Sequence, residues 1–109
     1  MSEAELQRRI RKMCRELGLA VQHVDNSLAG RVWLPGWPDL TIVGTEIYYA
    51  ELKNDHDGLE PAQREVRYIL MRGGANWVLW RPQDLYDGTV ARLLVSISPE
   101  QRAAPSTSG

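Results

Sequence analysis

Two short apolar runs, separated by three residues, restrict what this chain can fold into. Residues 40–43 and 47–52 are rich in β-branched and aromatic side chains, which favour strands. Residues 44–46 between them, Gly-Thr-Glu, are typical of a short hairpin loop. The sequence therefore predicts two antiparallel strands, and a three-residue loop sets their register so that Asp39 faces Glu51.

Side chains alternate between the two faces of a strand, so Asp39, Glu51 and Lys53 project together from one face of this hairpin. Directly opposed carboxylates destabilise a sheet by about 0.2–1 kcal/mol, and a divalent cation neutralises them. Mg²⁺ favours one or two carboxylates with waters and phosphate oxygens. A lysine two residues beyond the second carboxylate reaches the attacking water or the scissile phosphate. The pattern indicates phosphodiester hydrolysis. The opposite, apolar face carries Leu40, Ile42, Ala50 and Leu52.

The same residues resemble a known nuclease signature. Pro38-Asp39, eleven intervening residues and then Glu51-Leu52-Lys53 are similar to the PD-(D/E)XK pattern. The surrounding order resembles a VRR-NUC domain over about residues 2–81, and small stand-alone members of that family are similar to Holliday junction resolvases. The resemblance implies a restriction-endonuclease-like α/β fold and metal-dependent cleavage of nucleic acid. The segments that carry it are Glu3-Ala-Glu-Leu-Gln7, Gly36-Trp-Pro-Asp-Leu40, Ala50-Glu-Leu-Lys53, Gln63 and Gly73-Gly74.

The resemblance also implies roles for individual residues. Lys53 orients or activates the water for in-line attack, and Gln63, near the start of a later helix, supports the site. Glu3 leads the small-x-Leu-Gln run of the first helix and is implied as a further acid, whereas Glu5 has a capping role with Ser2. No small-molecule cofactor is implied. The implied ligands of Mg²⁺ or Mn²⁺ are Asp39, Glu51, Glu3 and the carbonyl group of Leu52.

Periodicity places the other elements of the chain. Leu6, Ile10, Met13 and Leu17 recur at helical spacing, which predicts a first helix over about residues 3–17. The expected order is α-β-β-β-α-β, a mixed sheet flanked by helices. The remaining predicted elements are a strand over 19–24, a loop over 25–36, a helix from Pro61 to Gly73-Gly74, a strand over 75–81 and a turn over 84–88.

The segment 89–97 is ambiguous, because its apolar residues have helical spacing while several are β-branched. A helix, a strand and a subunit contact all stay open there. We expect one domain over residues 1–97 and a disordered tail over 98–109, where Pro, Ala, Ser and Gly predominate. Cys14 is the single cysteine, no apolar run is long enough to span a bilayer, and the start of the chain does not resemble a signal peptide. These features predict a cytoplasmic protein without a membrane partner.

The formal net charge is −1, so nucleic-acid binding needs a local basic patch rather than bulk attraction. A solvated helix face is the alternative interpretation of the basic first helix. Trp33 and Trp37 are candidates for stacking on splayed bases, but in a chain without phenylalanine we expect the tryptophans to fill the core. The residues expected to contact nucleic acid are Arg8, Arg11, Lys12, Arg31, Arg64 and Arg67.

Two functions remain open at this stage. The first is a Mg²⁺- or Mn²⁺-dependent endodeoxyribonuclease, selective for branched or Holliday junction DNA. It is expected to be a homodimer, because symmetric cutting of a four-way junction needs two sites related by a two-fold axis. The second is a branched-DNA-binding module with a nuclease-like fold that is non-catalytic or depends on a partner. The presence of Asp39, Glu51 and Lys53 together favours the nuclease.

Overall fold

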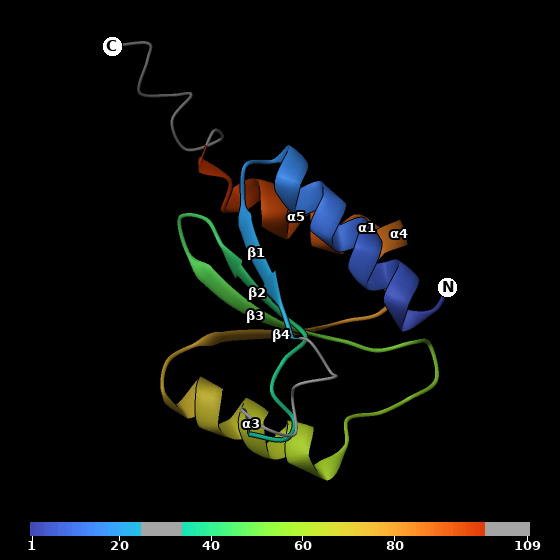
Figure 1. Ribbon diagram of the computed structural model, residues 1–109, viewed down its shortest axis with the longest axis vertical. Coiled ribbons are helices and arrows are strands. Elements are labelled where there is room, and N and C mark those ends of the chain that lie inside the picture. Colours follow the sequence, from blue (N-terminus) through green and yellow to red (C-terminus); the bar gives the residue numbers. More distant parts are fainter. Residues whose placement is uncertain (25–33, 100–109) are drawn as a thin grey trace.

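The computed structural model describes residues 1–24 and 34–99. A mixed four-stranded sheet, in the order β1-β2-β3-β4, has α1, α4 and α5 on one side and α3 on the other (Figure 1). The predicted α/β class and the order of elements through β4 are confirmed. The bounds are α1 Glu3–Glu16, β1 Ala20–His23, β2 Leu40–Val43, β3 Ile47–Leu52, α3 Pro61–Arg72, β4 Asn76–Trp80, α4 Pro82–Tyr86 and α5 Thr89–Ser96.

The main core lies between the sheet and the α1–α5 layer. Helix α1 begins where the Ser2 hydroxyl accepts a 3.1 Å hydrogen bond from the backbone N–H of Glu5, which satisfies one of the free amide groups of the first turn. From α1, Leu6, Ile10 and Cys14 are completely buried, because their spacing places them on one stripe of the helix. They pack against the apolar face of the hairpin, which consists of Leu40, Ile42, Ala50 and Leu52.

The β2–β3 hairpin has the predicted register, with Val43 opposite Ile47. Its tip is fastened to the end of α5, because the N–H of Thr45 donates a 2.8 Å hydrogen bond to the carbonyl oxygen of Ile97. A Cβ atom on Gly44 would lie 2.1 Å from the same carbonyl oxygen, so only glycine permits this approach. Strand β4 then adds to β3 in parallel, after the crossover through α3.

The C-terminal part differs from the sequence-based expectation. Residues 84–88 were predicted as a turn, but Pro82–Tyr86 form α4, since proline suits the first helical position and the Asp84 carboxylate accepts a 2.8 Å hydrogen bond from the Arg81 N–H. The ambiguous segment 89–97 forms α5 and its C-terminal cap. The completely buried side chains of this segment are Val90, Leu94 and Ile97. They belong to the core of the same chain rather than to a subunit contact.

Ser98, the first residue of the predicted disordered tail, packs against the folded part of the chain. Ser98 is buried, and its hydroxyl donates a 3.0 Å hydrogen bond to the carbonyl oxygen of Leu17. This contact holds Ser98 against the C-terminal end of α1. Residues 100–109, most of the predicted tail, lie outside the described residues. Among residues 1–24 and 34–99, no helix is long and apolar enough to cross a membrane.

Candidate active site

Asp39 stands at the start of β2, where the preceding loop passes over α3. Gly36 has a φ of +86°, and a Cβ atom there would lie 2.4 Å from the backbone of Ala62, so glycine alone lets the loop touch the first turn of α3. One carboxylate oxygen of Asp39 accepts a 2.8 Å hydrogen bond from the backbone N–H of Leu52. This bond gives a partner to the Leu52 N–H, which lies on β3 beyond the first residue of β2, and it directs the carboxylate toward β3.

Glu51 is the buried acid of the site, with only 3% of its surface exposed. Its Oε1 accepts a 3.1 Å hydrogen bond from the amide of Gln63, whereas Oε2 is buried and accepts no hydrogen bond from a donor group of the described residues. Burial, then a hydrogen bond with the Asp39 carboxyl group and the charge of that group, raise the pKa of Glu51 to about 9, against an opposing effect of Lys53. An unpaired buried oxygen beside a second carboxylate is an arrangement that a divalent cation completes.

Gln63 has its orientation determined by the cap of α3. Its side-chain oxygen accepts a 2.8 Å hydrogen bond from the backbone N–H of Glu60, the residue before the helix. Because the oxygen is used there, the NH₂ group is the end that faces Glu51. The resemblance predicted that Gln63 supports the site, and the structure places it there. From the residues alone it has the pattern of an ordinary surface glutamine.

Lys53 follows the last residue of β3 and is buried, with 6% of its surface exposed. Its backbone N–H donates a 3.0 Å hydrogen bond to the carbonyl oxygen of Trp80, so the β3–β4 pairing positions the residue. The charge of Lys53 opposes the increase in pKa at both Glu51 and Glu3. A cation is therefore held close to the acids, as the alternation of the hairpin predicted.

Arg81 supports the loop after Lys53, and the sequence analysis missed this role. One guanidinium nitrogen donates to the carbonyl oxygens of Asn54 and Asp57, at 2.6 and 2.7 Å. The Asn54 side chain also accepts hydrogen bonds from the backbone of His56 and Asp57, which closes a tight turn. No local sequence pattern indicates the arginine, because its partners are 24 and 27 residues away.

Glu3 approaches the site from the first turn of α1. It is exposed, and together with Ala4, Gln7, Asp39 and Leu52 it lines a pocket of about 250 Å³. Partial desolvation, and then the charge of Asp39, raise the pKa of Glu3, although Lys53 opposes the change. Within the described part of the chain, no group of three or more acid, histidine or cysteine side chains is arranged to hold a metal ion. Asp39 and Glu51 are the two neighbouring carboxylates that could hold a cation, and Leu52 contacts Asp39 through its backbone N–H.

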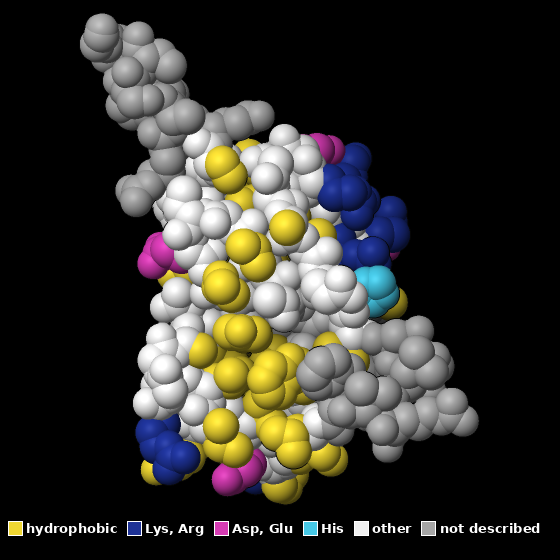
Figure 2. Space-filling view, turned by 60° about the vertical axis from the view of Figure 1, so that its left-hand side comes forward, with side chains coloured by type: hydrophobic (Ala, Val, Ile, Leu, Met, Phe, Trp, Pro, Cys, Tyr) yellow, Lys and Arg dark blue, Asp and Glu magenta, His cyan; other side chains and the backbone are white. Residues whose placement is uncertain are grey.

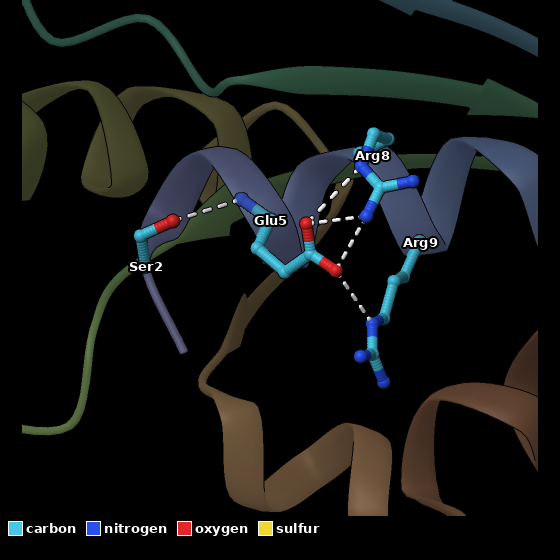
Figure 3. Close-up of polar contacts among 4 residues, drawn as sticks. All are labelled: Ser2, Glu5, Arg8 and Arg9. Atoms are coloured by element: carbon cyan, nitrogen blue, oxygen red, sulfur yellow. Dashed lines mark hydrogen bonds and ion pairs between the residues drawn. The ribbon is translucent and has the colours of Figure 1, made fainter.

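The carboxylate of Glu5 forms ion pairs along α1 and does not line this pocket. Figure 3 shows its carboxylate bound to Arg8, at 2.5 Å, and to Arg9, at 3.0 Å. These hydrogen bonds lower the pKa of Glu5. Its carboxylate therefore does not complete the expected capping box with the Ser2 amide, and only the Ser2 hydroxyl caps the helix. The two acids of the first turn thus have different surroundings, as the sequence predicted, although the partner of Glu5 is different.

The basic residues expected to contact nucleic acid are on both sides of the sheet. On α1, Arg8 is paired with Glu5, and Lys12 lies 3.8 Å from Glu16. Arg11 is half-buried, and its Nε has no hydrogen-bond partner among the residues that the structure describes. Of the three arginines on α3, the two that were expected to contact nucleic acid are exposed on the helix surface. They are Arg64 and Arg67, whereas Arg31 lies outside the described residues.

The tryptophans serve mainly in packing, as expected. Trp80 is buried, at 2% exposure, and Trp37 is half-buried with its ring edge-on to Tyr49, at 6.0 Å between centroids. Trp77 is half-buried beneath Arg67. Trp33, the other candidate for base stacking, lies outside the described residues.

The arrangement of sheet and helices is that of a nuclease-like α/β domain. A solved structure described as a VRR-NUC domain is similar to this chain, with a TM-score of 0.61 and 23% identity over 80% of this chain and 92% of that one. A second, described as a VRR-NUC domain protein, has a TM-score of 0.64 and 20% identity over 85% of each chain. The chain therefore has the VRR-NUC fold that the motif predicted. No protein-family model and no curated protein matches the sequence.

Proposed function

We propose that this protein is a metal-dependent endodeoxyribonuclease that hydrolyses phosphodiester bonds in branched DNA. The observation that carries the proposal is the Oε2 atom of Glu51, which is buried beside the Asp39 carboxyl group and accepts no hydrogen bond from a donor group of the described residues. A buried polar atom without a partner is costly, and such atoms concentrate where a ligand or ion completes the site. The VRR-NUC fold supplies the reaction type by analogy.

Each residue of the site has a defined task in this proposal. Asp39, Glu51 and the Leu52 carbonyl would hold Mg²⁺ or Mn²⁺, which would supply Lewis-acid stabilisation of the phosphate and lower the pKa of the attacking water. Lys53 orients the attacking water and stabilises the negative charge that develops on the phosphate. Gln63 keeps Glu51 directed toward Asp39 through its hydrogen bond. Glu3, at the mouth of the pocket, is the further acid.

Branched DNA requires a second active site for symmetric cutting, so we propose a homodimer as well. Three exposed apolar side chains support a contact between copies: Val43 and Ile47 beside the hairpin loop, and Val95 on α5, which are 38–46% exposed. The hairpin tip is tied to the end of α5, so the three belong to one end of the molecule. Figure 2 shows hydrophobic side chains along the side of the molecule that carries this tip.

Labelled four-way junction, flap, duplex and single-stranded DNA test the proposal in parallel. We expect cleavage of the branched substrates with Mg²⁺ or Mn²⁺, and binding with little turnover in Ca²⁺, which prefers looser and higher coordination. Asp39→Asn should abolish cleavage, whereas Asp55→Asn, at an exposed acid of the loop after β3, should not. Full activity in excess chelator would refute the metal site. Junction binding without cleavage in any metal would favour the binding module.

A further inference from the structure

The outer surface of α3 carries a row of five side chains that the proposed reaction does not use. Their spacing of three, four, seven and eight residues places them on one face of the helix. They line an open depression of about 500 Å³. We call it the α3 groove, and it consists of Arg64, Arg67, Tyr68, Met71 and Arg72.

The three arginines of the α3 groove keep their charge available. Arg64 donates a hydrogen bond to a backbone carbonyl, at 2.7 Å. The guanidinium groups of Arg67 and Arg72 lie over the rings of Trp77 and Tyr68, at 5.1 and 5.5 Å. Over residues 1–24 and 34–99, none of the three forms an ion pair with a carboxylate. The α3 groove therefore presents three positive charges held in place by stacking and a backbone contact.

The basic groove on α1 differs in this respect. It is lined by residues of α1 and α4, and it contains two acids of its own, Glu5 and Glu16. Glu5 binds Arg8 and Arg9, so these arginines are already neutralised within the protein (Figure 3). An anionic ligand would have to displace Glu5 there, whereas it displaces no carboxylate in the α3 groove. Charge complementarity thus favours α3 as the surface for a polyanion.

The apolar members of the groove indicate which polyanion fits. Tyr68 is 59% exposed and Met71 is 49% exposed, between the arginines. A duplex offers such side chains its backbone and the edges of its bases, but only an unpaired strand offers the faces of its bases, which stack on aromatic rings. One side of the Tyr68 ring is covered by Arg72. The exposed part of the ring provides a platform for a base.

The groove begins next to the candidate active site. Arg64 directly follows Gln63, whose amide contacts Glu51. From Arg64 to Arg72 the helix rises about 12 Å, which matches roughly three nucleotides of a stacked strand at about 3.4 Å each. We infer that the α3 groove binds an unpaired strand of the substrate, with phosphates on its three arginines and a base on Tyr68. The inference rests on the proposed function only in taking nucleic acid as the ligand.

A matched pair of double variants tests the inference. The probe is a fluorescent oligothymidine, and its Kd is measured in Ca²⁺ over a series of salt concentrations. We expect Tyr68→Ala/Arg72→Gln to weaken binding at least about tenfold, since stacking of one base and one phosphate contact are both lost. The control is Tyr86→Ala/Arg92→Gln, which removes an equally exposed tyrosine and an arginine from α4 and α5, and its Kd should stay within about twofold.

Two further measurements separate stacking from folding and from catalysis. Tyr68→Phe should restore affinity, because the ring is kept, and Arg67→Gln/Arg72→Gln should reduce the dependence of log Kd on log salt by about 0.7 per arginine. Mg²⁺-dependent thermal stabilisation should be unchanged in every groove variant, which shows an intact metal site. Wild-type affinity of Tyr68→Ala/Arg72→Gln, or an equal loss in the control, overturns the inference while leaving the proposed nuclease untouched. Absence of cleavage with normal groove binding would refute only the nuclease.

Discussion

Gln63 Nε2 lies 3.1 Å from Glu51 Oε1, and this hydrogen bond joins the first turn of α3 to the buried end of β3. The same side chain caps α3 through its oxygen, which accepts from Glu60. One glutamine therefore couples the start of a helix to the orientation of the acid in the site. The side-chain oxygen makes one contact and the NH₂ group makes the other, so a substitution can remove one contact and keep the other.

Substitutions at Gln63 should separate these two tasks. Gln63→Ala loses both, so we expect about 0.5–2 kcal/mol less stability from the lost cap, together with reduced turnover. Gln63→Glu keeps an acceptor for the Glu60 N–H but has no donor for Glu51, so turnover should fall about tenfold while the melting temperature is nearly retained. Thermal unfolding and initial rates measure the two effects. A fully active Gln63→Glu variant would contradict the role assigned to its donor.

The raised pKa of Glu51 predicts how the free energy of unfolding of the metal-free protein depends on pH. Its pKa in the folded protein, about 9, exceeds the ordinary value of 4.5, so the folded state binds this proton more tightly than the unfolded state. The free energy of unfolding should therefore decrease as pH rises from about 4.5 to about 9. Glu51→Gln should remove this slope, unlike Glu46→Gln on the exposed hairpin loop.

In the wild-type protein, bound Mg²⁺ should offset the loss of stability that ionisation of Glu51 causes. We expect the melting temperature at pH 8 to rise with Mg²⁺, by about 4–8 °C for each kcal/mol of binding free energy. Glu51→Gln should be more stable than the metal-free wild type at this pH and should show no Mg²⁺-dependent increase. An unchanged Mg²⁺ response in Glu51→Gln would argue against Glu51 as a ligand.

Glu3 and Glu5 should differ in their effect on catalysis. Glu3 lines the pocket with Asp39, whereas the carboxylate of Glu5 is occupied by Arg8 and Arg9. Glu3→Gln should lower turnover at least about tenfold with little change in melting temperature. Glu5→Gln loses only surface ion pairs, which solvent screens and which contribute little to stability, and keeps the Ser2 cap on its backbone. Reversed behaviour of the two variants would show that Glu5 is the acid of the site.

Lys53 should be essential for turnover but not for the fold. Because it is buried, Lys53→Met is a better test than alanine, since methionine retains most of the stem without leaving a large cavity. We expect a loss of about two to three orders of magnitude in turnover, with Mg²⁺-dependent stabilisation retained. Lys12→Met, at an exposed position of α1, is the matched control. Wild-type turnover of Lys53→Met would remove the lysine from the mechanism.

The proposed homodimer predicts a defined mass in solution. The wild-type chain should behave as a dimer at micromolar concentration, and Ile47→Asp should shift it toward monomer, because a charge in an apolar contact is strongly unfavourable. Ile47 is 46% exposed beside the hairpin loop, so the substitution leaves the core intact. Tyr86→Asp is the control on α4. Analytical ultracentrifugation measures both, and paired junction cleavage by a strict monomer would contradict the dimer.

The sequence by itself determined the parts of the site that depend on local geometry. The three-residue loop sets the hairpin register, which the strand pairing confirms. Alternation along the strands then predicts that Asp39, Glu51 and Lys53 share one face. The first helix and its apolar stripe also follow from short-range periodicity and from the Ser2 cap. These features are readable because each depends on contacts between residues close in the chain.

Only the tertiary structure decided the features that depend on distant contacts. The segment 89–97 became a helix because Val90, Leu94 and Ile97 fill the core beside α1, a burial that outweighs the strand preference of its β-branched residues. One local choice also differed from the prediction: Glu5 bound Arg8 and Arg9, three and four residues along the same helix, instead of the Ser2 amide, because charge-assisted hydrogen bonds are the stronger ones. The contacts of Arg81 with the loop after Lys53, and of Gly36 with α3, join segments about 25 residues apart. Which such segments meet is decided by packing, because no local pattern specifies it.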